Sequence, residues 1–148
     1  MKLEDEIKQS KFVSAHQKAV LNLLFTASWL QAKNNQFLKP FGITGSQFNI
    51  LRILKGQYPK SLSVGDIKSR MLDRNSDMPR LISRLLAKDL VMKRTCPDDK
   101  RASDITISEK GIDLLTEVNK YQKKLDSVLA LTEAEAKALS DLLDKSRG

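Results

Sequence analysis

The 148-residue sequence has very little of the residue types that build disulfides, metal sites and catalytic centres, with one Cys and one His. A single Cys excludes an internal disulfide framework, and one Cys with one His excludes a metal site made of those ligands alone. The same scarcity leaves no Cys/His or Ser/His/Asp set whose spacing suggests nucleophilic catalysis. We therefore expect neither an enzyme nor a cofactor.

Long apolar stretches are also missing. No run reaches the roughly 18 apolar residues of a transmembrane helix, and the start, MKLEDEIKQSK, mixes charges without the apolar segment of a signal peptide. The composition is 41% hydrophobic and 30% charged, which is typical of a globular chain, and the length suits one compact domain. We expect a cytoplasmic protein without a membrane partner.

Positive charge is what the sequence has in excess, with 26 Lys and Arg against 18 Asp and Glu. The excess is concentrated in residues 52–101, where thirteen basic and six acidic residues give a net charge of +7. Residues 1–51 carry +3 and residues 102–148 carry −2. Phosphates are the commonest partners of such a basic segment, because neutralising them releases counterions. Nucleic acid is the predicted partner, and a solvated surface without a partner is the alternative.

The two ends of the chain have the period of long amphipathic helices. Apolar residues recur every three or four positions from Phe12 to Leu30, which predicts one helix ending before Pro40. The same period predicts a long helix from Ser108 to Leu129, followed by a last helix. Together these helices have more apolar surface than a small lobe can cover, so we expect dimerisation helices over residues 1–39 and 111–148.

Residues 40–110 show short helices, a tight turn and a hairpin. Thr44 and Gln47 form a capping box, and Ser63 begins a further short helix after a very short strand at Leu62. After a turn at 72–75 another helix begins, for which we predict Ser76 as the cap. Segments 90–94 and 104–107 have the patterns of two strands. The fold class is therefore mainly α, a winged helix-turn-helix of about six helices with a two- to three-stranded β wing.

Such a lobe suits duplex DNA, because its second helix fits the major groove and its hairpin reaches phosphates or the minor groove. Asp77 has two interpretations: a helix-end acid that favours the helix dipole, or an acceptor for a cytosine amino group. Arginine is the commonest partner of guanine, through its bidentate fork. The candidate DNA contacts are Ser63, Arg74, Ser76, Asp77, Arg80, Ser83, Arg84 and, in the wing, Lys100.

The stretch from Gly42 to Gly111 resembles the MarR family of bacterial transcriptional regulators. The matching pieces are ITGSQFNILRIL, SVGDIKSRM, RLISRLLAKDLVMKR and DDKRASDITISEKG. The resemblance implies that Arg101 enters the minor groove or grips the backbone, while Asp99 orients its guanidinium. Asp89 departs from the family pattern, which usually has Gly before the Leu-Val strand.

The resemblance also implies a homodimer with interlocked terminal helices and two DNA-binding lobes. A two-fold dimer would read a pseudo-palindromic operator with half-sites about 10 base pairs, or a multiple, apart. The implied action is repression, relieved by a small aromatic or anionic effector between the dimer helices and the DNA lobe. Phe25, Trp29, Phe41 and Phe48 are the candidate lining residues, with core packing as the alternative for each.

We therefore expect a sequence-specific DNA-binding transcriptional regulator. The alternative is a winged-helix module that binds other proteins without specific DNA binding, and salt-dependent binding to duplex DNA separates the two. Cys96 stands near Arg94 before the wing tip, and its interpretation as a redox switch or an ordinary thiol stays open.

Overall fold

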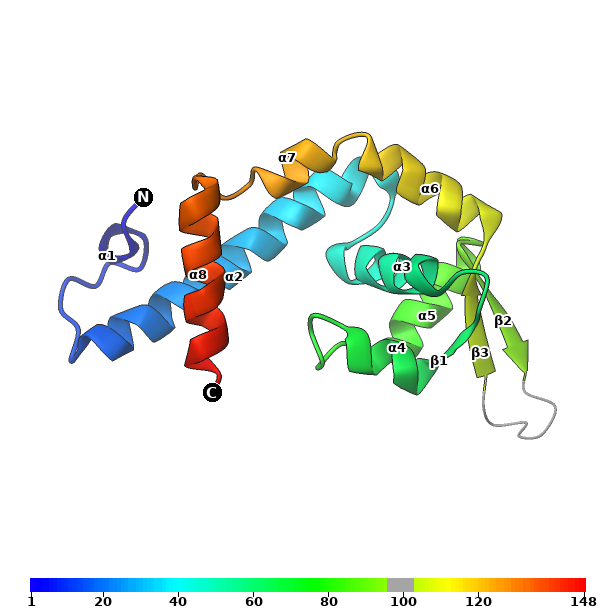
Figure 1. Ribbon diagram of the computed structural model, residues 1–148, viewed down its shortest axis with the longest axis horizontal. Helices are drawn as coiled ribbons and strands as arrows, with labels where there is room; N and C mark the ends of the chain where they lie inside the picture. The colour runs from blue at the N-terminus through cyan, green and yellow to red at the C-terminus, as the bar shows by residue number, and fades with distance from the viewer. Residues whose placement is uncertain (96–102) are drawn as a thin grey trace.

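The computed structural model describes residues 1–95 and 103–148 and consists of helices arranged around a small antiparallel sheet (Figure 1). Its elements are α1 (Leu3–Glu6), α2 (Ala15–Leu38), the 3-10 turn η1 (Lys39–Phe41), α3 (Gly45–Gln57), β1 (Leu62–Ser63), α4 (Val64–Arg70), α5 (Met78–Ala87), β2 (Val91–Thr95), β3 (Ser103–Ile107), α6 (Glu109–Asn119), α7 (Gln122–Asp126) and α8 (Glu133–Ser146). The sheet order is β1-β3-β2, with Leu62 opposite Ile105 and Val91 opposite Ile107. The predicted fold is confirmed, with eight α-helices in the described ranges against about six expected.

The hydrophobic core of the lobe (residues 40–110) forms where the apolar face of α3 packs against α4, α5 and the sheet. The predicted capping box begins α3: Gln47 N–H donates to Thr44 Oγ1 at 3.3 Å, and Thr44 N–H donates to Gln47 Oε1 at 3.1 Å. Each fully buried aliphatic side chain contributes about 1.5–3 kcal/mol relative to exposure. The largest such side chains in the lobe are Ile50, Leu51, Leu54, Ile67, Leu85, Ile105 and Ile107.

The start of α5 differs from the prediction, because Asp77 and not Ser76 is its cap. Arg80 N–H donates to Asp77 Oδ1 at 3.3 Å, and Pro79 falls in the first turn, where no intrahelical acceptor is available for an N–H. The Ser76 hydroxyl instead donates to the Asp73 carbonyl at 2.7 Å. Ser76 therefore closes the preceding turn, and the helix begins one residue later than expected.

The single long helix predicted after Ser108 is also wrong, since the chain leaves the helix between α6 and α7. Ser108 does cap α6, with its Oγ accepting from Gly111 N–H at 3.0 Å. At the break, the Tyr121 ring packs edge-on against Phe37, 6.3 Å between centroids, and at 6.1 Å from Phe41. Tyr121 therefore packs on α2 and η1. Because this tertiary contact also needs an aromatic side chain, the three- and four-residue spacing of apolar residues runs on past the position where the helix ends.

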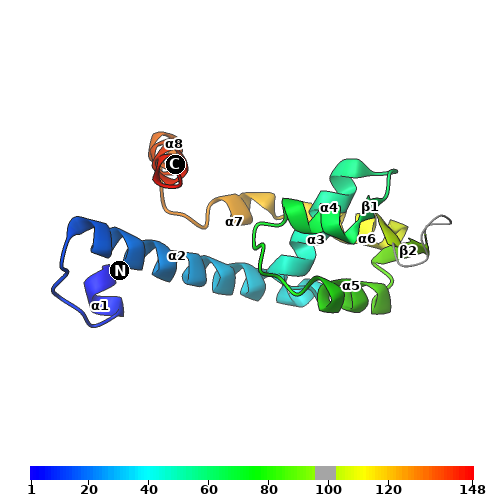
Figure 2. The ribbon, with the colours of Figure 1, turned by 90° about the horizontal axis from the view of Figure 1, so that it is seen from below.

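The outer helices α2 and α8 stand largely uncovered. The ribbon of α8 passes in front of α2 in Figure 1, but Figure 2 shows the two helices well apart. Residues 131–148 are exposed except for the half-buried Leu143, and Leu24 of α2 and Leu142 of α8 are each 64% exposed. Among the described residues, no helix has both the length and the apolar character that crossing a membrane requires.

Candidate nucleic-acid interface

Helix α5 has one face in the lobe core and the opposite face open. Met78, Ile82 and Leu85 are buried, whereas Arg80 and Arg84 are exposed. This division follows from the helical period, which puts residues three or four apart on one side. Lys88 continues the Arg80–Arg84 row at the same four-residue spacing, just after the end of the helix. The structure thus exposes Arg80 and Arg84 on the open face, as the sequence predicted. Lys88 extends this basic row by one residue that the sequence analysis did not include.

A hollow of about 600 Å³ lies between the start of α4, the side of α5 and the wing strands. Ser63, Ser83 and Lys93 line it together. Ser63 also caps α4, its Oγ accepting from Asp66 N–H at 3.1 Å. Two predicted DNA contacts are therefore brought together, and Lys93 is a neighbour that sequence reasoning missed. The basic pair Lys93-Arg94 in the first wing strand was the signal for it.

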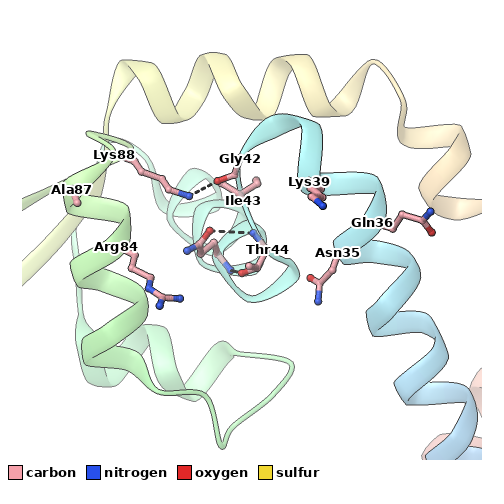
Figure 3. A pocket seen from close by; sticks show the side chains of 10 residues that line it. Asn35, Gln36, Lys39, Gly42, Ile43, Thr44, Arg84, Ala87 and Lys88 are labelled. Carbon is pink, nitrogen blue, oxygen red and sulfur yellow. Dashed lines mark hydrogen bonds between the residues drawn. The ribbon is translucent and has the colours of Figure 1, made fainter.

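On another side of α5, a cavity of about 790 Å³ lies between α2, α3 and α5 (Figure 3). Arg84 and Lys88 line it from α5, and Lys39 lines it from the end of α2. The Lys88 ammonium donates to the Gly42 carbonyl. Arg84 therefore belongs both to the basic row and to this cavity. The sequence analysis did not name Lys39 or Lys88 as site residues. The four-residue spacing between Arg84 and Lys88 was a signal that these two side chains lie on one face.

Asn35 ties the long helix α2 to the beginning of α3 at the edge of this cavity. Its Oδ1 accepts from Gly45 N–H at 2.7 Å, which satisfies one of the free N–H groups at the helix start. The Cβ of any residue larger than glycine at position 45 would lie 3.3 Å from that oxygen. The bond joins the long helix to the lobe at one point.

The remaining predicted DNA contacts are dispersed or outside the described residues. Arg74 is exposed in the loop between α4 and α5. Of the two interpretations of Asp77, capping is present in the structure, while a contact with cytosine stays a prediction. Asp99, Lys100, Arg101 and Cys96 lie outside the described residues.

Asp89, the departure from the family pattern, adopts a φ of 58°, in the left-handed region that favours glycine. Its carbonyl accepts from the Ser108 hydroxyl at 2.6 Å. Asp tolerates this region better than most residues, so the tight turn into β2 persists without glycine.

The four aromatic residues predicted to line an effector site do not share one cavity. Phe48 is part of the lobe core, at 8% exposure. Phe41 packs against Phe37, 5.9 Å between ring centroids. Phe25 and Trp29 line a small hollow of about 160 Å³ together with residues of the N-terminal segment. In the described ranges, no cluster of three or more His, Cys, Asp or Glu could hold a metal ion.

Comparison with known proteins agrees with this architecture. The model of the MarR family matches residues 43–103. The HTH-type transcriptional regulator MhqR of Bacillus subtilis is 25% identical over 115 residues, covering 75% of this chain and 77% of MhqR. The S. aureus MepR–DNA complex superposes with a TM-score of 0.75 at 21% identity, covering 92% of this chain and 97% of MepR.

A mutant MarR from E. coli complexed with operator DNA also has a TM-score of 0.75 at 21% identity, and the match covers 99% of each chain. The structural likeness extends beyond residues 43–103 to the outer helices, because the superposition covers nearly the whole of both chains. The match to the MarR family model over residues 43–103 falls on the segment where the motifs of the winged helix-turn-helix predicted this resemblance.

Proposed function

We propose that this chain is a sequence-specific DNA-binding transcriptional regulator that acts as a homodimer on a pseudo-palindromic operator. The observation that carries the proposal is the open face of α5, where Arg80, Ser83 and Arg84 are exposed while the opposite face is buried in the lobe. MhqR is named a transcriptional regulator, and MepR was solved with DNA, which supports the same role here.

The chemistry of the open face suits base reading in the major groove. Each arginine can donate two parallel hydrogen bonds to one guanine, which discriminates against a wrong base by about 1–3 kcal/mol. Ser63, Ser83 and Lys93 can position the lobe through phosphates, because hydroxyl and ammonium donors fit phosphate oxygens. The net charge of +7 over residues 52–101 strengthens binding without adding sequence preference.

The uncovered helices support the homodimer. Leu142 of α8 and Leu24 of α2 would lose their exposed apolar surface against a second copy, and burying such surface favours association. Residues 1–39 and 111–148 then serve as dimerisation segments, and residues 40–110 as the DNA-binding lobe. We further propose that the homodimer represses transcription and that binding of a small effector relieves this repression.

Selection of duplexes from a random DNA pool, followed by fluorescence anisotropy over a range of salt concentrations, tests the proposal. We expect a preferred duplex whose affinity falls steeply as salt rises. Arg80→Ala and Arg84→Ala should each relax the preference for one base by about 1–3 kcal/mol.

Lys137→Ala is the matched control, because it removes an equal charge from α8, where Lys137 pairs with Asp141 at 2.7 Å. This variant should keep the base preference of the wild type. If no duplex binds in a salt-dependent way, the DNA-binding proposal is wrong and the protein-interaction module is favoured.

A further inference from the structure

The C-terminal end of α5 is held by the start of α6. Three consecutive carbonyls that follow the helix, those of Lys88, Asp89 and Leu90, each accept a hydrogen bond from this segment. The donors are the Lys110 ammonium at 3.0 Å, the Ser108 hydroxyl at 2.6 Å and the Ser108 N–H at 3.1 Å, in that order. The wing strands β2 and β3 pair between these two helices. Helix α5, the wing and α6 therefore form one unit.

The Lys88 side chain joins this unit to the long helix α2. It extends from the end of α5 to Gly42, whose carbonyl accepts a hydrogen bond from its ammonium (Figure 3). Gly42 ends η1, the turn that follows α2 directly. Within residues 1–95 and 103–148, this is the one hydrogen bond between α5 with its C-cap and the segment 15–44. Elsewhere the cavity of about 790 Å³ lies between α2 and α5.

The bond from Lys88 is a second attachment of α2 to the lobe. The first is the bond from Gly45 N–H to Asn35 Oδ1 at 2.7 Å, which joins α2 to the start of α3. The two bonds lie on different sides of the cavity, one at α3 and one at α5. A body held at two separate points cannot rock about either of them. The orientation of α5 relative to α2 therefore depends on Lys88.

We propose that Lys88 is a positioning residue whose bond to Gly42 sets the distance between the two α5 helices of the homodimer, and with it the half-site spacing that the dimer accepts. The inference rests on the proposed function, in which α2 belongs to the dimer frame and each α5 reads one half-site. Lys88 acts there without touching DNA. Because α5, the wing and α6 move as one unit, a chain without this bond still reads the bases of each half-site but tolerates a changed spacing.

The first experiment measures the position of α5 relative to α2 and needs no DNA. Two spin labels are attached at exposed positions, through Gln31→Cys on α2 and Asn75→Cys in the turn before α5, in a chain that also carries Cys96→Ser. An excess of unlabelled chain keeps the measured pair within one subunit, and double electron–electron resonance gives the distance distribution. We expect Lys88→Met to broaden this distribution. The same distribution with and without Lys88→Met would overturn the positioning role.

The second experiment compares the selected duplex with copies in which one base pair is added or removed between the half-sites. One base pair moves the second half-site by about 3.4 Å along the DNA axis and turns it by about 35°. Fluorescence anisotropy measures the affinity that each change costs. In Lys88→Met this cost should shrink by about fivefold or more, the factor that corresponds to one hydrogen bond of ordinary net strength. The preference for individual bases within a half-site should stay as in the wild type.

Two other roles of Lys88 predict different results. If Lys88 contacts a phosphate, Lys88→Met weakens binding to every duplex alike and lowers the slope of log affinity against log salt by about one per subunit. If Lys88 only stabilises the fold, urea denaturation shows a loss of stability while the spacing preference stays unchanged. Either result would overturn the proposal.

Two further variants serve as controls in both experiments. Lys88→Arg keeps a cationic donor and should keep the narrow distance distribution and the spacing preference, and a variant no better than Lys88→Met would overturn the role of the donor. Lys39→Met removes a cation that lines the same cavity from the end of α2, and it should behave as the wild type. If the selection yields no duplex with two half-sites, the proposed function fails, and the role of Lys88 in spacing fails with it. The distance distribution still decides whether Lys88 holds α5 to α2, so the two failures are distinguishable.

Discussion

Replacing Gly111 with Ala tests how closely α6 packs on the wing sheet. A Cβ at this position would lie 2.3 Å from the Leu90 carbonyl oxygen and 2.7 Å from Ile107 Cγ1, both far below ordinary contact. The Leu90 oxygen cannot move freely, because it accepts from Ser108 N–H at 3.1 Å. The added methyl group therefore has to push α6 away from the sheet.

The cost follows from two opposing effects. Overpacking a core costs about 1–3 kcal/mol, and the better helix propensity of Ala offsets about 0.5–1 kcal/mol of it. Because the closest atom to the new Cβ is the backbone oxygen of Leu90, we expect an overpacking cost in the upper part of the range of about 1–3 kcal/mol. The expected loss in the free energy of unfolding is about 2 kcal/mol, which lowers the melting temperature by about 4–8 °C for a chain of this size.

Urea denaturation followed by circular dichroism at a fixed chain concentration measures this loss. Gly56→Ala makes the same chemical change within α3, where the new Cβ meets nothing within 4 Å. That control should gain up to about 0.5–1 kcal/mol. The packing of α6 inferred here would be refuted if Gly111→Ala were as stable as the wild type.

Three further expectations concern association, the wing and acid. Leu142→Lys should leave α8 helical and yield monomers in sedimentation experiments, and a dimer of unchanged affinity would contradict the proposed interface. Arg101→Ala should weaken DNA binding in anisotropy titrations with little change in base preference; a lost preference would argue against a wing role. The hydrogen bond from Lys18 lowers the pKa of Glu4 below its usual 4.5, so the pair stabilises α1 on α2 above that pH and is lost as pH falls through the lowered pKa. Trp29 fluorescence should then change in acid, and this transition should be absent in Lys18→Met.

Much of the fold could be predicted because its signals act over a few residues. The capping box at Thr44 and the helix starts at Ser63 and Ser108 all form as expected. A cap joins a side chain to an N–H two or three positions away, so its pattern is visible in the sequence. The buried face of α3 and the strand pairs of the wing follow in the same way from short periods.

Two helix boundaries were predicted wrongly, the start of α5 and the break between α6 and α7. The first depends on residues close together in the sequence, and the second lies at a contact between distant segments. Ser76 and Asp77 are both good caps, and a hydrogen bond to Asp73 decides between them by holding the Ser76 hydroxyl in the turn. At the break, Tyr121 packs against Phe37, which lies 84 positions earlier in the chain. No local signal marks that break.

The sequence by itself determined which side of α5 is open, because a helical period assigns Arg80 and Arg84 to one face wherever the helix packs. Only the tertiary structure decided what else Arg84 meets. Lys39 and Gln47 reach the same cavity as Arg84 from segments about forty residues away, and the packing of α2, α3 and α5 alone brings them together. Contacts between distant segments depend on the whole arrangement of elements, whereas faces and caps depend on neighbours along the chain.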